Sequence, residues 1–153
     1  MKTKKKLWIC IGLITLNILF IWGNSLLPGS ISGVISHWVR DVLATFLPGG
    51  GESPESSHGL VRKLAHFTEF ACLGCLLCWL FAMLKKPVWM ALPCGVLVAA
   101  ADETIQMFVP DRGPSLRDVA IDSSGVALGM ILLFVGYAYI KRKRKQVTED
   151  ISI

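Results

Sequence analysis

The stretch "PVWMALPCGVLVAAADETIQMFV", residues 87–109, decides the fold of this chain. It is long enough to cross the hydrocarbon core of a membrane as one helix, which takes about 20 apolar residues. Its only charged side chains are the adjacent acids Asp102 and Glu103. A charge at membrane depth costs at least about 2.5 to 3.5 kcal/mol and normally faces protein or water. The stretch therefore predicts a membrane helix whose acidic face is buried against other helices.

Three more apolar stretches qualify as membrane spans, at residues 7–27, 64–84 and 119–140. The chain is 53% hydrophobic and its mean hydropathy is +0.56, which is typical of membrane proteins. Four spans use most of the 153 residues, so no water-soluble core remains to be built. The sequence predicts an all-α membrane protein that forms a single domain over residues 1–153.

The basic residues predict the orientation, because Lys and Arg accumulate in the cytoplasmic loops of membrane proteins. They cluster at residues 2–6, at residues 85–86 and in "KRKRK" at residues 141–145, which together hold 11 of the 16 Lys and Arg residues. Both termini are therefore predicted to be cytoplasmic. We assign the net charge of +5 to contact with anionic lipid headgroups rather than to nucleic acid binding.

The segment between the first two spans is predicted to lie outside. Apolar residues recur at helical spacing over residues 31–47, which predicts an amphipathic helix in the outer interface. Residues 48–60, "PGGGESPESSHGL", are rich in Gly, Ser and Pro and predict a flexible outer loop. The cysteines at 72, 75 and 78 lie inside a span with no histidine at similar depth, so we interpret them as small buried apolar residues.

Polar side chains of three spans are predicted to lie in one layer near the outer surface. At a rise of roughly 1.5 Å per residue, His66, Glu69, Asp102 and Glu103 all fall about 6 to 12 Å below the outer ends of their helices. At about 100° per residue, the polar groups of each span also share a face of that helix. The predicted ligand-binding residues are Arg62, His66, Glu69, Asp102, Glu103, Gln106, Arg112, Arg117, Asp118 and Asp122.

Two local signals support this arrangement. Ser115 begins an S-x-x-D sequence that ends at Asp118, which is a form that caps the start of a helix. Gly125 and Gly129 have the small-x-x-x-small spacing that lets membrane helices approach closely. The polar face of the fourth span therefore continues into a packing face.

Three motifs resemble the VanZ-like membrane protein family: "RKLAHFTEF" at 62–70, "ETIQMFVPDR" at 103–112 and "SLRDVAIDSSGVALG" at 115–129. They occur in family order and spacing, and the resemblance covers roughly residues 7–140. The resemblance implies a multi-pass protein of the bacterial plasma membrane whose named prototype is linked to teicoplanin resistance. It supplies no catalytic residue and no cofactor. Where many relatives carry Gly and Asn, this chain has Asp111 and Asp122, so its site holds more negative charge.

Two classes of function remain open from the sequence. The first is binding of a lipid-anchored ligand at the outer leaflet, such as a cell-wall precursor or a lipoglycopeptide, with Arg112 and Arg117 contacting its anionic groups. The second is an enzyme acting on a lipid headgroup, with His66, Glu69, Glu103 and Asp122 as candidate acid–base residues. No cofactor is predicted, although His66, Glu103 and Asp122 suit a divalent metal by ligand type. A polar network that only fixes helix packing is the third alternative.

Overall fold

The computed structural model describes residues 2–28, 31, 34, 38, 54–110 and 112–151. The described residues form four long helices and one short 3₁₀ helix and no strand: α1 (Lys2–Ser25), α3 (Pro54–Met83), η1 (Val88–Met90), α4 (Ala91–Gln106) and α5 (Leu116–Ile151). Four segments are long and apolar enough to cross a membrane: Thr3–Ser25, Val61–Met83, Val88–Gln106 and Leu116–Arg144. The all-α class and the four predicted spans are confirmed.

The helix boundaries follow local signals. The hydroxyl of Ser115 accepts the backbone N–H of Asp118 at 3.2 Å, so the predicted capping motif does begin α5. α5 ends at Ile151, beyond the expected end of the fourth span at residue 140. The additional residues include "KRKRK" at 141–145. Lys and Arg are good helix formers, so the helix continues past the apolar span.

One predicted loop is partly helical, and this corrects the sequence prediction. We expected residues 48–60 to form a flexible loop, but α3 begins at Pro54. Proline favours the first position of a helix, because its fixed φ is helical and its missing N–H is not needed there. Residues 48–53 lie outside the described part of the chain. So does most of the predicted amphipathic helix at 31–47, of which Ile31, Val34 and Trp38 are described, each helical and exposed.

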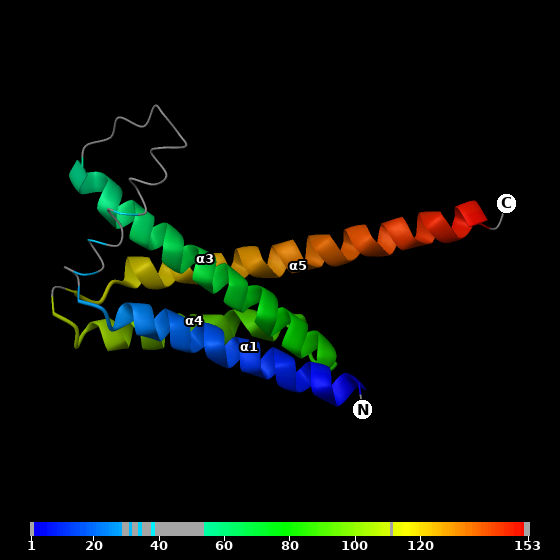
Figure 1. Ribbon diagram of the computed structural model, residues 1–153, viewed down its shortest axis with the longest axis horizontal. Helices are drawn as coiled ribbons and strands as arrows, with labels where there is room; N and C mark the ends of the chain where they lie inside the picture. The colour runs from blue at the N-terminus through cyan, green and yellow to red at the C-terminus, as the bar shows by residue number, and fades with distance from the viewer. Residues whose placement is uncertain are drawn as a thin grey trace.

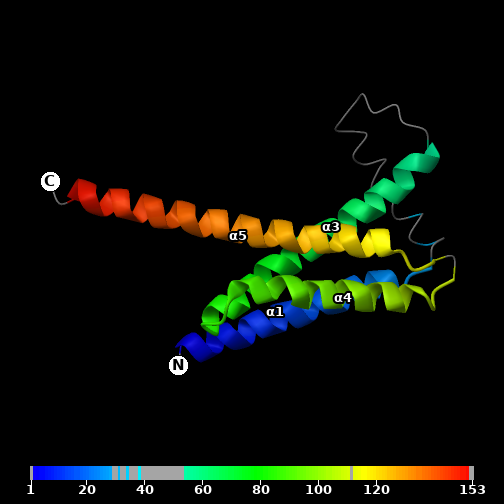
Figure 2. The same cartoon turned by 180° about the vertical axis from the view of Figure 1, so that it is seen from behind.

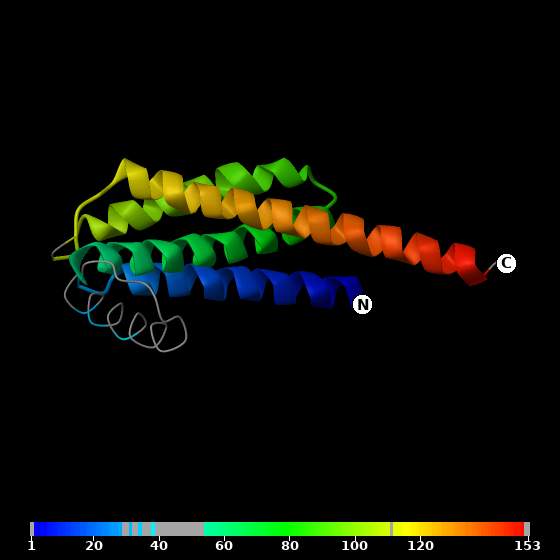
Figure 3. The same ribbon diagram turned by 90° about the horizontal axis from the view of Figure 1, so that it is seen from above.

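The two chain termini lie at the same end of the helix bundle (Figure 1). The opposite end gathers the last turn of α1, the first turns of α3, the last turn of α4 and the first turn of α5 (Figures 1 and 2). Seen from above, the helices run side by side and α5 extends well beyond the others (Figure 3). This arrangement brings the polar ends of all four helices together at one end.

Glycine allows α3 and α5 to pack with their backbones in contact. A Cβ atom added at Gly125 would meet the carbonyl oxygen of Phe67, and one added at Gly129 would meet that of Ala71. Gly74 of α3 faces the backbone of Val126 in the same way. Small residues on both helices therefore set the closest approach in the bundle, as the spacing of Gly125 and Gly129 predicted.

The orientation predicts a labelling pattern. In a cysteine-free variant, a single cysteine introduced at Ser57 should react with a membrane-impermeant reagent in intact cells, and one at Gln146 should not. The reason is the concentration of basic residues at the end of the bundle that holds both termini. Gln146 is exposed, so reaction after cell lysis is the control for its reactivity. Labelling of position 146 in intact cells would contradict the predicted orientation.

Candidate functional site

Buried polar side chains form a cluster at the end of the bundle opposite the termini. Asp102 is 0% exposed, Asp122 2%, Glu103 5% and Gln106 8%, and Ser25 of α1 is fully buried as well. The helices that carry them are otherwise apolar, and many of their large hydrophobic side chains are exposed on the outside of the bundle, where lipid would contact them. Asp102, Glu103 and Asp122 therefore face the inside of the bundle, as the sequence predicted.

Asp102 is held by two neighbours through one of its oxygens. Its Oδ2 atom accepts the hydroxyl of Ser25 at 2.8 Å and the Nε2 group of Gln106 at 2.8 Å. Gln106 Nε2 also lies 3.1 Å from the hydroxyl oxygen of Ser25. The other oxygen, Oδ1, is buried and receives no hydrogen bond from the described residues. One carboxylate oxygen therefore fixes the orientation of the side chain, and the other is available to a ligand.

Glu103 has a different partner, although it is the next residue along α4. Its Oε2 atom accepts the backbone N–H of Ser115 at 2.7 Å, and this contact ties α4 to the start of α5. A carboxylate at the start of a helix is also favoured by the helix dipole. Glu103 thus has a structural role that the sequence did not indicate.

His66 and Glu69 lie one helical turn apart on α3. The Nδ1 atom of His66 is 3.8 Å from Oε2 of Glu69, and Asn24 of α1 donates its amide to Oε1 of Glu69 at 2.8 Å. Both ring and carboxylate are largely buried, with 12% and 13% of their side-chain areas exposed. The pair therefore forms a chain of polar contacts that links α1 to the inside of the cluster.

The two arginines that follow α4 occupy different environments. Arg112 donates from Nη1 to the backbone oxygen of Ser25 at 3.3 Å, where the last carbonyl groups of α1 lack helical partners. Burial and the nearby charge of Arg62 lower the pKa of the Arg112 guanidinium, which remains protonated at neutral pH because its usual pKa is so high. Arg117 is exposed on α5 and does not border the cluster. The prediction that Arg117 belongs to the site is therefore not supported by its position.

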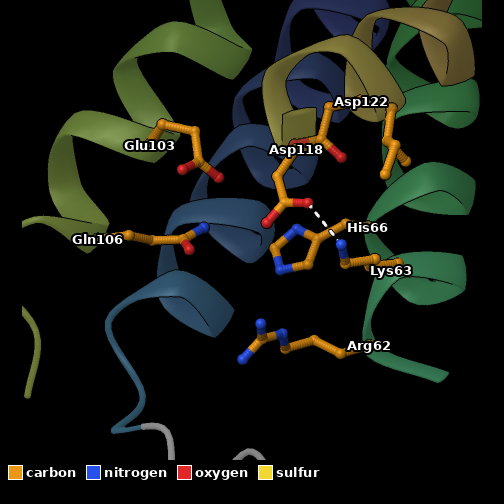
Figure 4. Close-up of a pocket in the computed structure, with 8 residues that line it drawn as sticks. Arg62, Lys63, His66, Glu103, Gln106, Asp118 and Asp122 are labelled. Atoms are coloured by element: carbon orange, nitrogen blue, oxygen red, sulfur yellow. Dashed lines mark ion pairs between the residues drawn. The ribbon is translucent and has the colours of Figure 1, made fainter. Parts of the chain in front are cut away.

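A small cavity of about 10 Å³ opens into the cluster, which is room for about one water molecule or one metal ion. Figure 4 shows the side chains of three helices converging on it. It is lined by Arg62, Lys63, His66, Glu103, Gln106, Asp118, Ile121 and Asp122. Lys63 Nζ lies 2.9 Å from Asp118 Oδ1, and this ion pair, drawn as a dashed line in Figure 4, borders the cavity.

The structure adds four residues that the sequence analysis did not assign to the site: Asn24, Ser25, Lys63 and Ile121. Asn24 and Ser25 are adjacent polar residues at the end of the first span, and this pairing is the sequence signal that could have identified them. Lys63 belongs to the motif "RKLAHFTEF" at 62–70. Its ion pair with Asp118 could not be predicted, because the two residues are far apart in the sequence. Ile121 carried no signal, because an apolar residue in a membrane helix is the ordinary case.

Comparison with known proteins gives one family. The family model described as VanZ/LLP1 matches residues 7–137, which is most of the chain. No curated protein and no solved structure matches significantly. The matched region includes most of each of the four spans and every residue that lines the cavity.

Proposed function

Because the chain belongs to the VanZ/LLP1 family and is a multi-pass membrane protein, we propose that it binds a lipid-anchored ligand of the bacterial cell envelope. Binding takes place at the outer leaflet of the plasma membrane, at the end of the bundle that carries the cavity. The cavity is too small for a whole ligand, so one anionic group binds at its rim beside Arg62 while the lipid part stays in the membrane.

Arg62 is the observation that carries this proposal. It lines the cavity, is partly exposed, and has no hydrogen bond or ion pair with any described residue. Lys63 beside it is already paired with Asp118. A planar guanidinium at the rim of a polar cavity suits a phosphate or carboxylate, which it can bind through two parallel hydrogen bonds. Arg62 therefore replaces Arg117 as the expected contact for the anionic group.

The proposed ligand class includes lipid-linked cell-wall precursors and lipoglycopeptides. A lipid-bearing glycopeptide concentrates in the layer where Arg62 and the cavity lie, and one without an acyl chain does not. We therefore propose that the protein contributes to teicoplanin-type resistance, as the resemblance to the family implied.

Expression in a sensitive Gram-positive host is expected to raise tolerance to teicoplanin more than to vancomycin. The variant Arg62→Gln should lose this gain, because a charge-assisted hydrogen bond contributes about 1.5 to 3 kcal/mol, roughly a tenfold to hundredfold change in affinity. The measurement is the minimal inhibitory concentration of each drug at matched protein abundance.

Arg117→Gln is the matched control, since Arg117 is an exposed arginine near the same end of the bundle that does not border the cavity. It should keep the full gain in tolerance. Equal tolerance to both drugs would argue against recognition of a membrane-anchored ligand, and equal loss in both arginine variants would argue against Arg62 as the contact.

A second candidate function is an enzyme that cleaves a lipid headgroup or a cell-wall precursor. The observation that favours it is the convergence of His66 with Asp102 and Asp122 beside the cavity. A histidine and carboxylates in one site supply the groups needed for general acid–base catalysis of hydrolysis. Release of a labelled headgroup by the purified protein, lost in His66→Gln, would distinguish this function from binding alone.

A further inference from the structure

We propose that His66, Asp102 and Asp122 bind one divalent cation of the Zn²⁺ or Mn²⁺ type between α3, α4 and α5. The inference goes beyond the proposed function, because it concerns the cation alone and holds whether or not the anionic ligand is bound. One imidazole and two carboxylates are ligands that these cations accept.

The donor atoms are close enough to share one ion. One nitrogen of His66 and one oxygen each of Asp102 and Asp122 lie within 4.8 Å of one another. With bonds of about 2.0 to 2.2 Å in a tetrahedral site, two donor atoms lie about 3.4 Å apart, so inward shifts of at most roughly 0.7 Å for each donor bring all three onto the ion. Each donor comes from a different helix, and the ion would cross-link α3, α4 and α5.

The surroundings of these side chains resemble the outer shell of a metal site. Ser25 and Gln106 hold one oxygen of Asp102, and the other oxygen is buried without a hydrogen bond from the described residues. Oε2 of Glu69 lies 3.8 Å from Nδ1 of His66, so a shift of under an ångström would form the hydrogen bond by which a carboxylate commonly orients a metal-binding histidine. A fully buried carboxylate oxygen without a donor is costly, and a cation would compensate it.

The charges of the cluster point to the same conclusion. With every acid counted as ionised and His66 as neutral, the described acids in and around the cluster outnumber the described bases by two. The acids are Glu69, Asp102, Glu103, Asp118 and Asp122. The bases are Arg62, Lys63 and Arg112. Bringing two unbalanced negative charges into the apolar part of a membrane protein is expensive, and one divalent cation balances them.

Glu103 is not part of the proposed site, in contrast to the sequence prediction of His66, Glu103 and Asp122. Neighbouring residues on a helix point about 100° apart. Asp102 faces His66 and Asp122, and the carboxylate of Glu103 accepts the N–H of Ser115. The cavity beside His66 and Asp122 leaves room for one water molecule as a further ligand.

The test is cation binding by the full chain, purified in mild detergent and stripped with a chelator. Titration with Zn²⁺, Mn²⁺ and Mg²⁺, followed by calorimetry and elemental analysis, should show one Zn²⁺ or Mn²⁺ per chain and much weaker binding of Mg²⁺. Asp102→Asn and Asp122→Asn should weaken binding by more than the roughly 10- to 100-fold that loss of an outer-shell partner costs, and Glu69→Gln by about that amount.

Glu103→Gln is the matched control, because it removes one nearby charge and its amide oxygen can still accept the N–H of Ser115. It should bind the cation nearly as tightly as the wild type. The proposal is overturned if folded wild-type protein, checked by gel filtration and thermal melting, binds none of the cations stoichiometrically. It is also overturned if Glu103→Gln weakens binding as much as Asp102→Asn, since the attraction would then be diffuse.

Discussion

Replacing Gly129 with leucine is expected to prevent α3 from packing on α5 and to abolish accumulation of the folded protein. Even a Cβ atom at this position would collide with the carbonyl oxygen of Ala71 and lie 2.9 Å from the backbone nitrogen of Cys75. Extra methylene groups in a packed core cost about 1 to 3 kcal/mol, and here the obstacle is backbone, which cannot rotate away. The helices must separate, and the polar cluster loses its alignment.

Gly136→Leu is the matched control, because Gly136 lies two turns further along α5 and an added Cβ atom there meets nothing within 4 Å. This variant should fold like the wild type. The measurement is the monodisperse fraction in gel filtration, together with resistance to protease in detergent. Similar behaviour of the two variants would contradict the close contact at Gly129.

The second large effect is expected at Asp122, where stability and function should change in opposite directions. The side chain is 2% exposed and receives no hydrogen bond from the described residues. Asp122→Asn keeps the shape and removes a charge that is expensive at membrane depth, so thermal stability in chelator should rise by about 1 to 3 kcal/mol. Tolerance to teicoplanin should fall toward that of cells without the protein, because the amide is a weaker ligand for the proposed cation than the carboxylate.

Asp118→Asn tests the specificity of this result. Asp118 borders the same cavity, but it is 24% exposed and paired with Lys63, so its loss should change stability by no more than about 1 kcal/mol. Thermal melting in detergent and drug tolerance are measured on both variants at equal abundance. If Asp122→Asn lowers stability and leaves tolerance unchanged, the polar cluster is a packing network and not a binding site.

The sequence by itself determined the class of the protein and the depth of its polar layer. Both depend on local properties, since the length of an apolar run decides whether it spans a membrane and helical rise decides where Asp102 or Asp122 lies along it. The cap at Ser115 and the packing face of Gly125 and Gly129 were equally readable, because each is a short pattern within one helix. The start of α3 at Pro54 could not be predicted from the sequence, because a stretch rich in Gly and Ser is also typical of a loop.

Only the tertiary structure decided which polar groups meet. Asp102 and Glu103 are neighbours in sequence at nearly the same depth, yet the first faces His66 and the second binds the N–H of Ser115. That choice depends on how far each helix is rotated about its axis, and the rotation is set by side-chain and backbone packing between helices. Ser25 reaches Asp102 across 77 positions of the chain for the same reason. Periodicity gives the faces of a single helix, whereas their mutual rotation is fixed by contacts between helices that no local pattern encodes.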